Sequence, residues 1–317
     1  MNTIQLQKDF GKLLKKNHQE FRNLFSSMET DCYRVYNWNI SEIPWLIDFY
    51  GNYLHISSLA QNHQPDLLEA ESDLLETASR MLYVPLERIF FKHRFVQGRQ
   101  VQHEKLNQSG HTLIVKEQGL LFKVNLSDYL DTGLFLDLRN SRQLVREAAA
   151  GMRLLNLFAY TGAFTVYAAA GAATKTVSVD LSAPYMRWAQ ENLDLNGLSG
   201  EMHTFINSDV REYLQEAIEG GEQYDLIILD PPTFSNSRKT EGTFDLQRDY
   251  VWFIGQCLKL LSKEGSLLFS TNYHKFHFDP GRLRGAEVQN TTSTTIPPDF
   301  NGKRRPHRSW VIRRKTR

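Results

Sequence analysis

The sequence contains little cysteine and no long apolar run. Only two cysteines, Cys32 and Cys257, occur among its 317 residues, which excludes a disulfide framework and a cysteine-based metal cluster. No stretch approaches the roughly 18 consecutive apolar residues that a membrane span needs, and the polar N-terminus lacks the apolar core of a signal peptide. We therefore expect a cytoplasmic protein that does not bind membranes.

Two nucleotide-binding motifs are also absent. The sequence has neither the GxGxxG turn that receives a dinucleotide pyrophosphate nor the Walker A phosphate loop. Their absence argues against NAD and FAD as cofactors. The composition is that of an ordinary globular protein, with 41% hydrophobic and 23% charged residues.

Acidic residues are missing from the last segment. Residues 303–317 carry eight Lys or Arg and no acid, although the net charge of the whole chain is only +1. Such a segment suits a nucleic-acid phosphate backbone, and the alternative is a solvated tail without a partner. The basic residues are Lys303, Arg304, Arg305, Arg308, Arg313, Arg314, Lys315 and Arg317.

The residue pattern divides the chain into three parts. Residues 1–30 predict an amphipathic helix, for which covering a sheet is the favoured role and RNA contact the alternative. Residues 31–126 carry strand signals around one helix that begins at Pro65, which predicts a small α+β module with a hairpin at 47–56. Residues 127–317 change to alternating strands and helices, which predicts a second domain.

This alternation predicts a Rossmann-like, doubly wound α/β sheet whose strands are mostly parallel. The expected strands are 153–158, 175–180, 203–208, 224–229, 266–271 and 307–312. The expected helices are 163–171, 183–196, 209–219, 244–262 and 279–289. Residues 290–298 are expected to form a loop or an edge strand.

Acidic residues follow successive strands of this sheet, and a small-residue turn follows the first strand. That turn contains Gly162 and opens a helix, so a ligand can approach its backbone closely. Asp180 ends the second strand and suits ribose hydroxyls, while Asp209 ends the third and suits an adenine amine. Each acid alone is a common helix N-cap. Asp180, Asp209 and Asp230, the acid after the fourth strand, together favour S-adenosyl-L-methionine, whose sulfonium needs no phosphate site.

The apolar run 224–229 ends in Asp230-Pro231-Pro232-Thr233-Phe234. In open α/β sheets the ligand crevice lies beyond the carboxyl ends of the strands. Two prolines fix the backbone there and remove two N–H donors, so carbonyl oxygens and the Phe234 ring can face a flat base. A proline-stiffened turn is the alternative. We expect a nucleobase methyltransferase with Asp230, Pro231, Pro232 and Phe234 at the target base.

Two other chemistries are disfavoured. Methylation at carbon 5 of a pyrimidine needs a cysteine nucleophile, but Cys257 lies among apolar residues of a predicted helix and Cys32 is remote in sequence. His274 and His277 form an HxxH pair, and without a further ligand nearby a zinc site is disfavoured as well.

The sequence resembles the class I RNA methyltransferases of the RlmK type, the guanine-N7 half of the fused RlmKL enzymes. The resemblance covers most of the chain and implies a Rossmann-like methyltransferase domain after a small RNA-contacting module. It also implies methyl transfer to a guanosine of 23S rRNA at N7. The segments that carry it are NLSDYLDTGLFLDLR, NLFAYTGAFTVYAAAGA, VDLSAPYMRWAQENLDLNG and DLIILDPPTFSNSRKTEGTFDLQRD.

Pattern and resemblance together give two sets of candidate residues. The predicted cofactor contacts are Asn156, Phe158, Tyr160, Thr161, Gly162, Asp180, Leu181, Asp209, Val210 and Asp230. The predicted RNA contacts are Arg94 in a basic, glutamine-rich run, Tyr129, Asp137 and Arg139 by resemblance alone, and Arg238, Lys239 and Arg248 just after the target-base loop. For the last three, surface solubility is the alternative.

The sequence departs from the fused enzymes in ways that leave alternatives open. It contains neither their THUMP module nor their N2-guanine methyltransferase half, and Leu138 replaces a histidine of their FLDHR segment. We expect the first module and the basic tail, or a separate methyltransferase or THUMP-containing partner, to capture 23S rRNA or a large-subunit assembly intermediate. N2-guanine or N6-adenine methylation, and an RNA-binding assembly factor with a vestigial cofactor pocket, remain alternatives.

Overall fold

The computed structural model describes residues 3–60, 65–94, 110–235, 244–300, 302 and 305–315. The chain forms two compact units. The first comprises Met1–Leu136 and Pro298–Arg305, and the second comprises Asp137–Pro297 and Pro306–Arg317. The first unit therefore includes the N-terminal helix, continues past the predicted boundary at residue 126, and takes in a short segment near the C-terminus.

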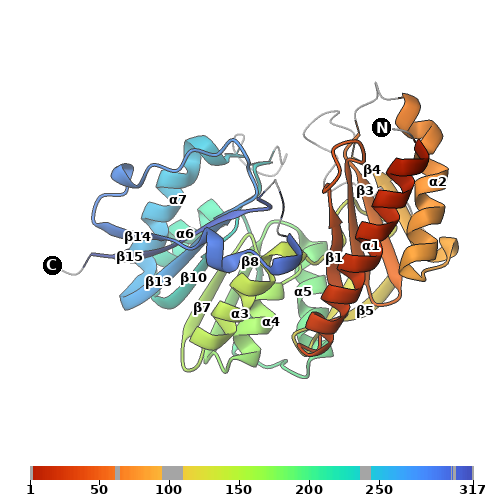
Figure 1. The fold of residues 1–317 in the computed structure, drawn as a ribbon. Helices are drawn as coiled ribbons and strands as arrows, with labels where there is room; N and C mark the ends of the chain where they lie inside the picture. Colours follow the sequence, from red (N-terminus) through yellow and green to blue (C-terminus); the bar gives the residue numbers. More distant parts are fainter. Residues whose placement is uncertain are drawn as a thin grey trace. The chain divides into compact units, whose positions relative to one another are not determined.

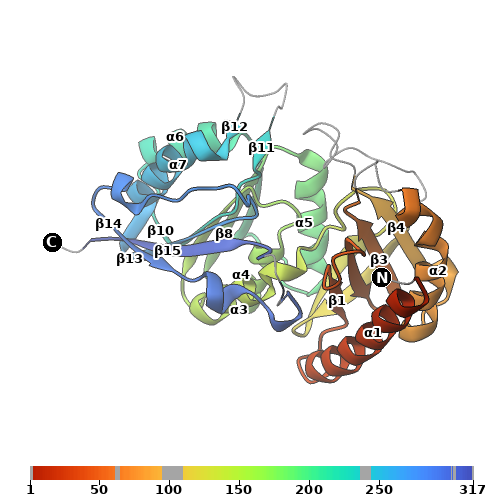
Figure 2. The same ribbon diagram turned by 45° about the horizontal axis from the view of Figure 1, so that its top comes forward.

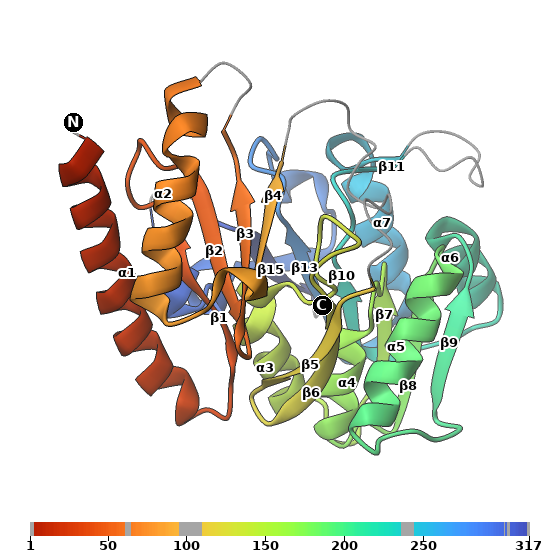
Figure 3. The same ribbon diagram turned by 90° about the vertical axis from the view of Figure 1, so that its right-hand side faces the viewer.

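The first unit is a four-stranded sheet with two helices on one face. The sheet order is β1-β2-β3-β4, with β4 parallel to β3 and the other pairs antiparallel. Figure 3 shows α1 and α2 side by side against the same face of this sheet. The elements are α1 (Thr3–Ser26), β1 (Cys32–Asn37), β2 (Trp45–Tyr50), β3 (Tyr53–Ser58), α2 (Pro65–Leu82) and β4 (Ile89–His93).

Helix α1 covers the sheet with its apolar side, as predicted. Phe10, Leu14 and Phe25 are buried among the aromatic and aliphatic residues of β1 and β2. The hairpin predicted at 47–56 is confirmed: β2 and β3 are joined by a two-residue turn in which Gly51 has a φ of 60°. This left-handed conformation is one that glycine adopts without steric cost.

A separate hairpin and a returning segment complete the first unit. Strands β5 (Thr112–Glu117) and β6 (Leu120–Asn125) pair antiparallel around a two-residue turn at Gln118 and Gly119. The short helix η5 (Pro298–Phe300) returns to β1, where the Asp299 carboxylate accepts the Arg34 backbone N–H at 2.9 Å. The Arg34 guanidinium also lies 4.4 Å from the Phe300 ring centroid, which explains why residues 298–305 belong to this unit.

The second unit contains a seven-stranded sheet in the order β14-β15-β13-β10-β7-β8-β9. The five strands from β13 to β9 run parallel, and β15 and β14 are added antiparallel. The mostly parallel α/β sheet predicted from the sequence is thereby confirmed. The strands are β7 (Arg153–Leu157), β8 (Lys175–Asp180), β9 (His203–Asn207), β10 (Tyr224–Leu229), β13 (Leu261–Thr271), β14 (Ala286–Asn290) and β15 (Arg308–Arg314).

Helices cover both faces of this sheet (Figure 1). Helices α3, α4 and α5 pack together on one face, and α6 and α7 pack on the other. Buried aliphatic side chains of β7, β8 and β10 form a core beneath α6 and α7. No helix among the described residues is long and apolar enough to cross a membrane. The helices are α3 (Arg139–Ala148), α4 (Ala163–Ala170), α5 (Ala183–Leu195), α6 (Val210–Glu219) and α7 (Leu246–Leu260).

The prediction of a helix over 279–289 is wrong. This segment forms one short turn, η4 (Pro280–Arg282), and then strand β14. Gly285 lies between them with a φ of 73°, a conformation that interrupts a helix. The backbone groups of β14 instead find partners in antiparallel pairing with β15. After β14 the chain forms a single helical turn, α8 (Thr292–Thr295).

Candidate active site

The turn after β7 has a strained backbone. Phe158 and Tyr160 have φ values of 56° and 51°, and Gly162 has a φ of 72°. A residue other than glycine in this region costs about 1 kcal/mol or more, and such strain clusters at ligand sites. A Cβ on Gly162 would lie 2.7 Å from the Ala189 Cβ, so only glycine allows α4 to begin this close to α5. The turn therefore offers backbone rather than side chains to a ligand.

Asp180, at the end of β8, fastens this turn. Its carboxylate accepts the backbone N–H of Tyr160 at 3.0 Å and that of Ser182 at 2.9 Å. An ionised carboxylate can accept about four hydrogen bonds, so these two contacts are compatible with the predicted ribose role. The Tyr160 ring packs edge-on against Tyr185 with centroids 4.6 Å apart. Asp180 thus holds the backbone of Tyr160, and Tyr185 packs against its ring.

Asp209 caps helix α6, which was the structural alternative for this residue. Its carboxylate accepts the backbone N–H of Arg211 at 2.6 Å. The adjacent Val210 side chain is buried in the core, so this position can offer a ligand only its backbone. The adenine contact of Asp209 and Val210 stays a prediction, and so does that of Leu181, a half-buried residue just after Asp180.

Two of the predicted cofactor residues are engaged inside the protein. The Asn156 side chain is buried and donates to the Thr165 hydroxyl at 3.0 Å. The Thr161 carbonyl accepts the side-chain N–H of Asn192, on α5, at 2.9 Å. Sequence reasoning did not find Asn192, because an asparagine within a helix carries no local signal. Its hydrogen bond joins α5 to residues 158–162, which we call the cofactor turn.

Residues 230–234, which we call the target-base motif, are anchored to the end of the neighbouring strand β13. The Ser270 hydroxyl donates to the Asp230 carboxylate at 2.6 Å, and the Thr233 hydroxyl donates to the Asn272 side-chain oxygen at 3.2 Å. The Phe234 ring meets Tyr273 edge-on with centroids 5.8 Å apart. Pro231 is buried and Pro232 is half-buried. Asp230 and Thr233, the residues on either side of the two prolines, are therefore both bonded to the end of β13.

A two-stranded ribbon follows the motif (Figure 2). Strand β11 (Phe234–Ser235) pairs antiparallel with β12 (Phe244–Asp245). Phe158, from the cofactor turn, packs against Phe244 of this ribbon with ring centroids 5.6 Å apart. An aromatic contact thus links the turn after β7 to the target-base motif through β12, which pairs with Phe234.

The Asp230 carboxyl lies in a poorly solvated environment. Burial raises its pKa from the usual value of 3.8 to about 6. The Ser270 hydrogen bond opposes this effect, the charge of Asp137 adds to it, and the charges of His307 and Arg142 oppose it. At neutral pH most Asp230 carboxyls are therefore ionised, and below about pH 6 most are protonated.

The predicted RNA contacts are mostly engaged within the protein. Arg248 forms a two-pronged ion pair with Asp249, which also bonds Arg211 at 2.8 Å. In the second unit Asp137 bonds His307, and Arg139 is 1% exposed. In the first unit Arg94 pairs with Asp131 at 2.9 Å, and the Tyr129 carbonyl accepts the Lys92 ammonium. Their RNA roles stay predictions, and Arg238 and Lys239 lie outside the described residues.

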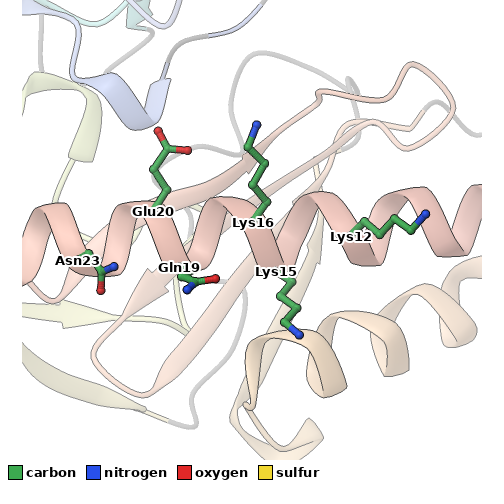
Figure 4. Close-up of a pocket in the computed structure, with 6 residues that line it drawn as sticks. All are labelled: Lys12, Lys15, Lys16, Gln19, Glu20 and Asn23. Atoms are coloured by element: carbon green, nitrogen blue, oxygen red, sulfur yellow. The ribbon is translucent and has the colours of Figure 1, made fainter.

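Helix α1 carries the clearest basic surface of the described residues in the first unit. Lys8, Lys12, Lys15 and Lys16 are exposed, and within the described residues none of these lysines forms a salt bridge. Three of them border a shallow surface hollow (Figure 4). The hollow is lined by Lys12, Lys15, Lys16, Gln19, Glu20 and Asn23.

Comparison with known proteins gives one consistent family. Residues 46–283 match the S-adenosylmethionine-dependent methyltransferase family. The chain is 39% identical to "Ribosomal RNA large subunit methyltransferase K" of Neisseria meningitidis serogroup B, over 97% of this chain and 87% of that protein. It is also 39% identical to "Ribosomal RNA large subunit methyltransferase K/L" of Aeromonas salmonicida, over 97% of this chain but only 43% of that protein.

Solved structures agree with this assignment. The crystal structure of SMU.776 complexed with SAH matches with a TM-score of 0.76 and 25% identity, over 96% of this chain and 81% of that one. A SAM-dependent methyltransferase from Agrobacterium tumefaciens shares the fold, with a TM-score of 0.63 and 20% identity over 90% and 91% of the two chains. With the strained turn, the strand-end acids and the DPPTF motif on one sheet edge, these matches place the chain in the S-adenosylmethionine-dependent methyltransferase family.

Proposed function

We propose that the chain transfers a methyl group from S-adenosyl-L-methionine to a guanosine of 23S rRNA, at N7. The observation that carries the proposal is the half-buried Asp230 with Pro231 and Pro232 at the end of β10, next to a ribbon whose Phe244 packs against Phe158 of the cofactor turn. The relatives named for large-subunit rRNA methylation support the substrate class. Because the chain spans less than half of the K/L relative, the proposal concerns one methyl transfer only.

The cofactor turn fits S-adenosyl-L-methionine. Gly162 gives the turn a position without a side chain, and Asp180 and Asp209 stand at the neighbouring strand ends, where ribose and adenine would bind. When bound, the cofactor supplies an electrophilic methyl group. The chain's own part is to hold the two reactants in line, and such positioning is worth roughly 7–11 kcal/mol at most.

The surroundings of Asp230 favour a target that gains positive charge. Guanine N7 has a lone pair and no proton, so its methylation needs no general base, and the product ring is cationic. An ionised Asp230 in a poorly solvated site would stabilise the charge that develops. An exocyclic amine could use the carbonyl oxygens of the same loop, so N2-guanine and N6-adenine are the outcomes against which N7 is tested.

RNA capture is proposed for α1 together with the basic C-terminal segment. The lysines at positions 8, 12, 15 and 16, which form no salt bridge with a described residue, lie along one helix. Positions 8 to 16 span about 12 Å at a rise of 1.5 Å per residue. Such a row suits consecutive phosphates of a nucleic-acid backbone. A separate THUMP-containing or methyltransferase partner, a large-subunit assembly intermediate as substrate, and a cytoplasmic location are parts of the same proposal.

Transfer of labelled methyl groups into 23S rRNA that lacks its own modifications tests the proposal. Naked RNA and unmodified large-subunit particles are offered in parallel, with Asp230→Ala as the inactive control. We expect label in the RNA with the wild-type chain and none with the variant. If the cofactor binds but neither RNA nor particle is labelled, the assembly-factor alternative replaces the enzyme.

A further inference from the structure

A chain of buried hydrogen bonds in the second unit leads toward Asp230. The His307 ring has its Nδ1 3.0 Å from the Asp137 carboxylate and its Nε2 2.9 Å from the Thr295 hydroxyl. The Thr295 hydroxyl in turn lies 2.7 Å from that of Ser309. His307 is 3% exposed, and Thr295 and Ser309 are fully buried. His307 lies in the basic C-terminal segment, at the start of the strand predicted over 307–312, and the sequence predicted no role for this histidine.

From Ser309, the path to Asp230 crosses two paired strands. Ser309 on β15 stands directly opposite Ser270 on β13. Opposite residues of an antiparallel pair point to the same face, with Cβ atoms about 4.5–5.5 Å apart. The Ser270 hydroxyl donates to Asp230 at 2.6 Å. Polar side chains therefore lead from the Asp137–His307 pair to the acid at the target base, with Ser309 and Ser270 as cross-strand neighbours.

We propose that Asp137 and His307 are positioning residues that set the charge and the orientation of Asp230 for methyl transfer. The proposal rests on the function proposed above. A buried acid–histidine pair loses solvation and is costly unless each partner is well bonded. Here both nitrogens of the ring have partners, so the ring is held in one orientation with the Asp137 carboxylate on its Nδ1 side.

The charges of the pair act on Asp230 in opposite directions. The negative charge of Asp137 raises the pKa of Asp230, and the positive charge of His307 lowers it, as does that of Arg142. Burial is the largest cause of the raised pKa, and Ser270 opposes it through its hydrogen bond. A mere tether between the start of α3 and β15 would not move the titration of Asp230, so this titration separates the two roles.

Two conservative variants test the pair. Asp137→Asn removes the negative charge, and His307→Asn keeps an amide N–H near the Nδ1 position but has no cationic form. The titration of Asp230 is followed by carboxyl 13C NMR in the full chain, with no RNA present. We expect the Asp230 midpoint to fall in Asp137→Asn and to rise in His307→Asn, each by about half a pH unit or more. The pH at which kcat falls on the acid side should shift in the same direction as the Asp230 midpoint.

Controls keep the result interpretable. Asp279→Asn changes an acid of the same unit that caps η4 and should leave the midpoint unchanged. His307→Gln retains a group near Nε2 and provides a second neutral variant if His307→Asn unfolds. An unchanged midpoint in folded variants of both residues would overturn the proposal. If the midpoints shift as expected while the wild-type chain methylates no RNA, the pair stands and the proposed function fails.

Discussion

Asp180 and Asp230 occupy equivalent places in the fold, at the carboxyl ends of β8 and β10 on either side of β7, but their surroundings differ. Asp180 accepts two backbone N–H groups and fixes the cofactor turn. Asp230 accepts the Ser270 hydroxyl, and burial raises its pKa to about 6. One acid therefore sets geometry through its hydrogen bonds. Asp230 instead carries a charge, and neighbouring groups change the pKa that governs it.

The largest expected effect follows from removing the charge of Asp230. Asp230→Asn preserves the shape of the side chain but cannot be negatively charged, so methyl transfer should fall about 100- to 1000-fold, the usual loss for one electrostatic group of a reaction site. Cofactor affinity, measured by calorimetry, shows separately how much the predicted cofactor contact of Asp230 contributes. Glu264→Gln, an exposed change in the same unit, serves as the control. A variant that keeps full activity would remove Asp230 from the mechanism.

A substitution in the cofactor turn should act on stability and binding together. Gly162→Ala introduces a Cβ 2.7 Å from the Ala189 Cβ in a left-handed conformation, so we expect about 2–4 kcal/mol of lost unfolding free energy from overpacking and strain. Gly221→Ala is the matched control, because its φ is +68° but open space surrounds it. Equal losses in the two variants, measured by urea unfolding, would show that contact with α5 is unimportant.

The raised pKa of Asp230 predicts that activity and stability oppose each other at this residue. The folded protein binds the Asp230 proton more tightly than the unfolded chain, because the pKa rises from 3.8 to about 6. This group therefore favours folding below pH 4, and that contribution is lost as the pH rises through 6. Asp230→Asn should be more stable than the wild-type chain by about 3 kcal/mol at pH 8, because each unit of the pKa rise is worth about 1.4 kcal/mol, with little difference at pH 4.

Urea unfolding at the two pH values measures this difference. A variant that is less stable than the wild-type chain at pH 8 would show that Asp230 is satisfied by its hydrogen bond, as Asp180 is, and would erase the contrast between the two acids.

The smallest expected effect concerns RNA affinity, which should be separable from both acids. Replacing Lys12, Lys15 and Lys16 together by Gln should weaken RNA binding several-fold and reduce the slope of log K against log salt by about 2, at roughly 0.7 per phosphate contact with a single strand. Cofactor binding and kcat should not change. The control replaces three exposed lysines of the second unit, Lys175, Lys259 and Lys263.

Filter binding at several salt concentrations gives both quantities. If the α1 and control variants lose affinity equally, the α1 lysines form only a solvated face. If the wild-type chain binds the cofactor but neither naked RNA nor unmodified large-subunit particles, the RNA substrate itself is excluded.

The sequence predicted the parallel strands and their terminal acids because these signals are local. Apolar runs such as 224–229 end in turn residues, and the acid that follows each run marks the strand end. The helix predicted over 279–289 failed because pairing with β15, formed by residues far along the chain, outweighs local preference. Helix α3 was not predicted at all.

Local sequence patterns could not predict the polar side chains that surround the site. His307 and Asp137 are 170 positions apart in the sequence, so no spacing rule connects them. Asn192, which holds the cofactor turn, lies inside an ordinary helical pattern. The sequence thus located the acids at the strand ends, but their different hydrogen-bond environments emerge only when distant segments pack together.

The identity of the methylated nucleoside tests the central claim most directly. Unmodified 23S rRNA is incubated with the chain and labelled S-adenosyl-L-methionine, digested to nucleosides and resolved by mass spectrometry. The account predicts 7-methylguanosine with the wild-type chain and its loss with Asp230→Asn. A methyl group on guanine N2 or adenine N6 would contradict the role given to the Asp230 charge, because neither product carries a cationic ring.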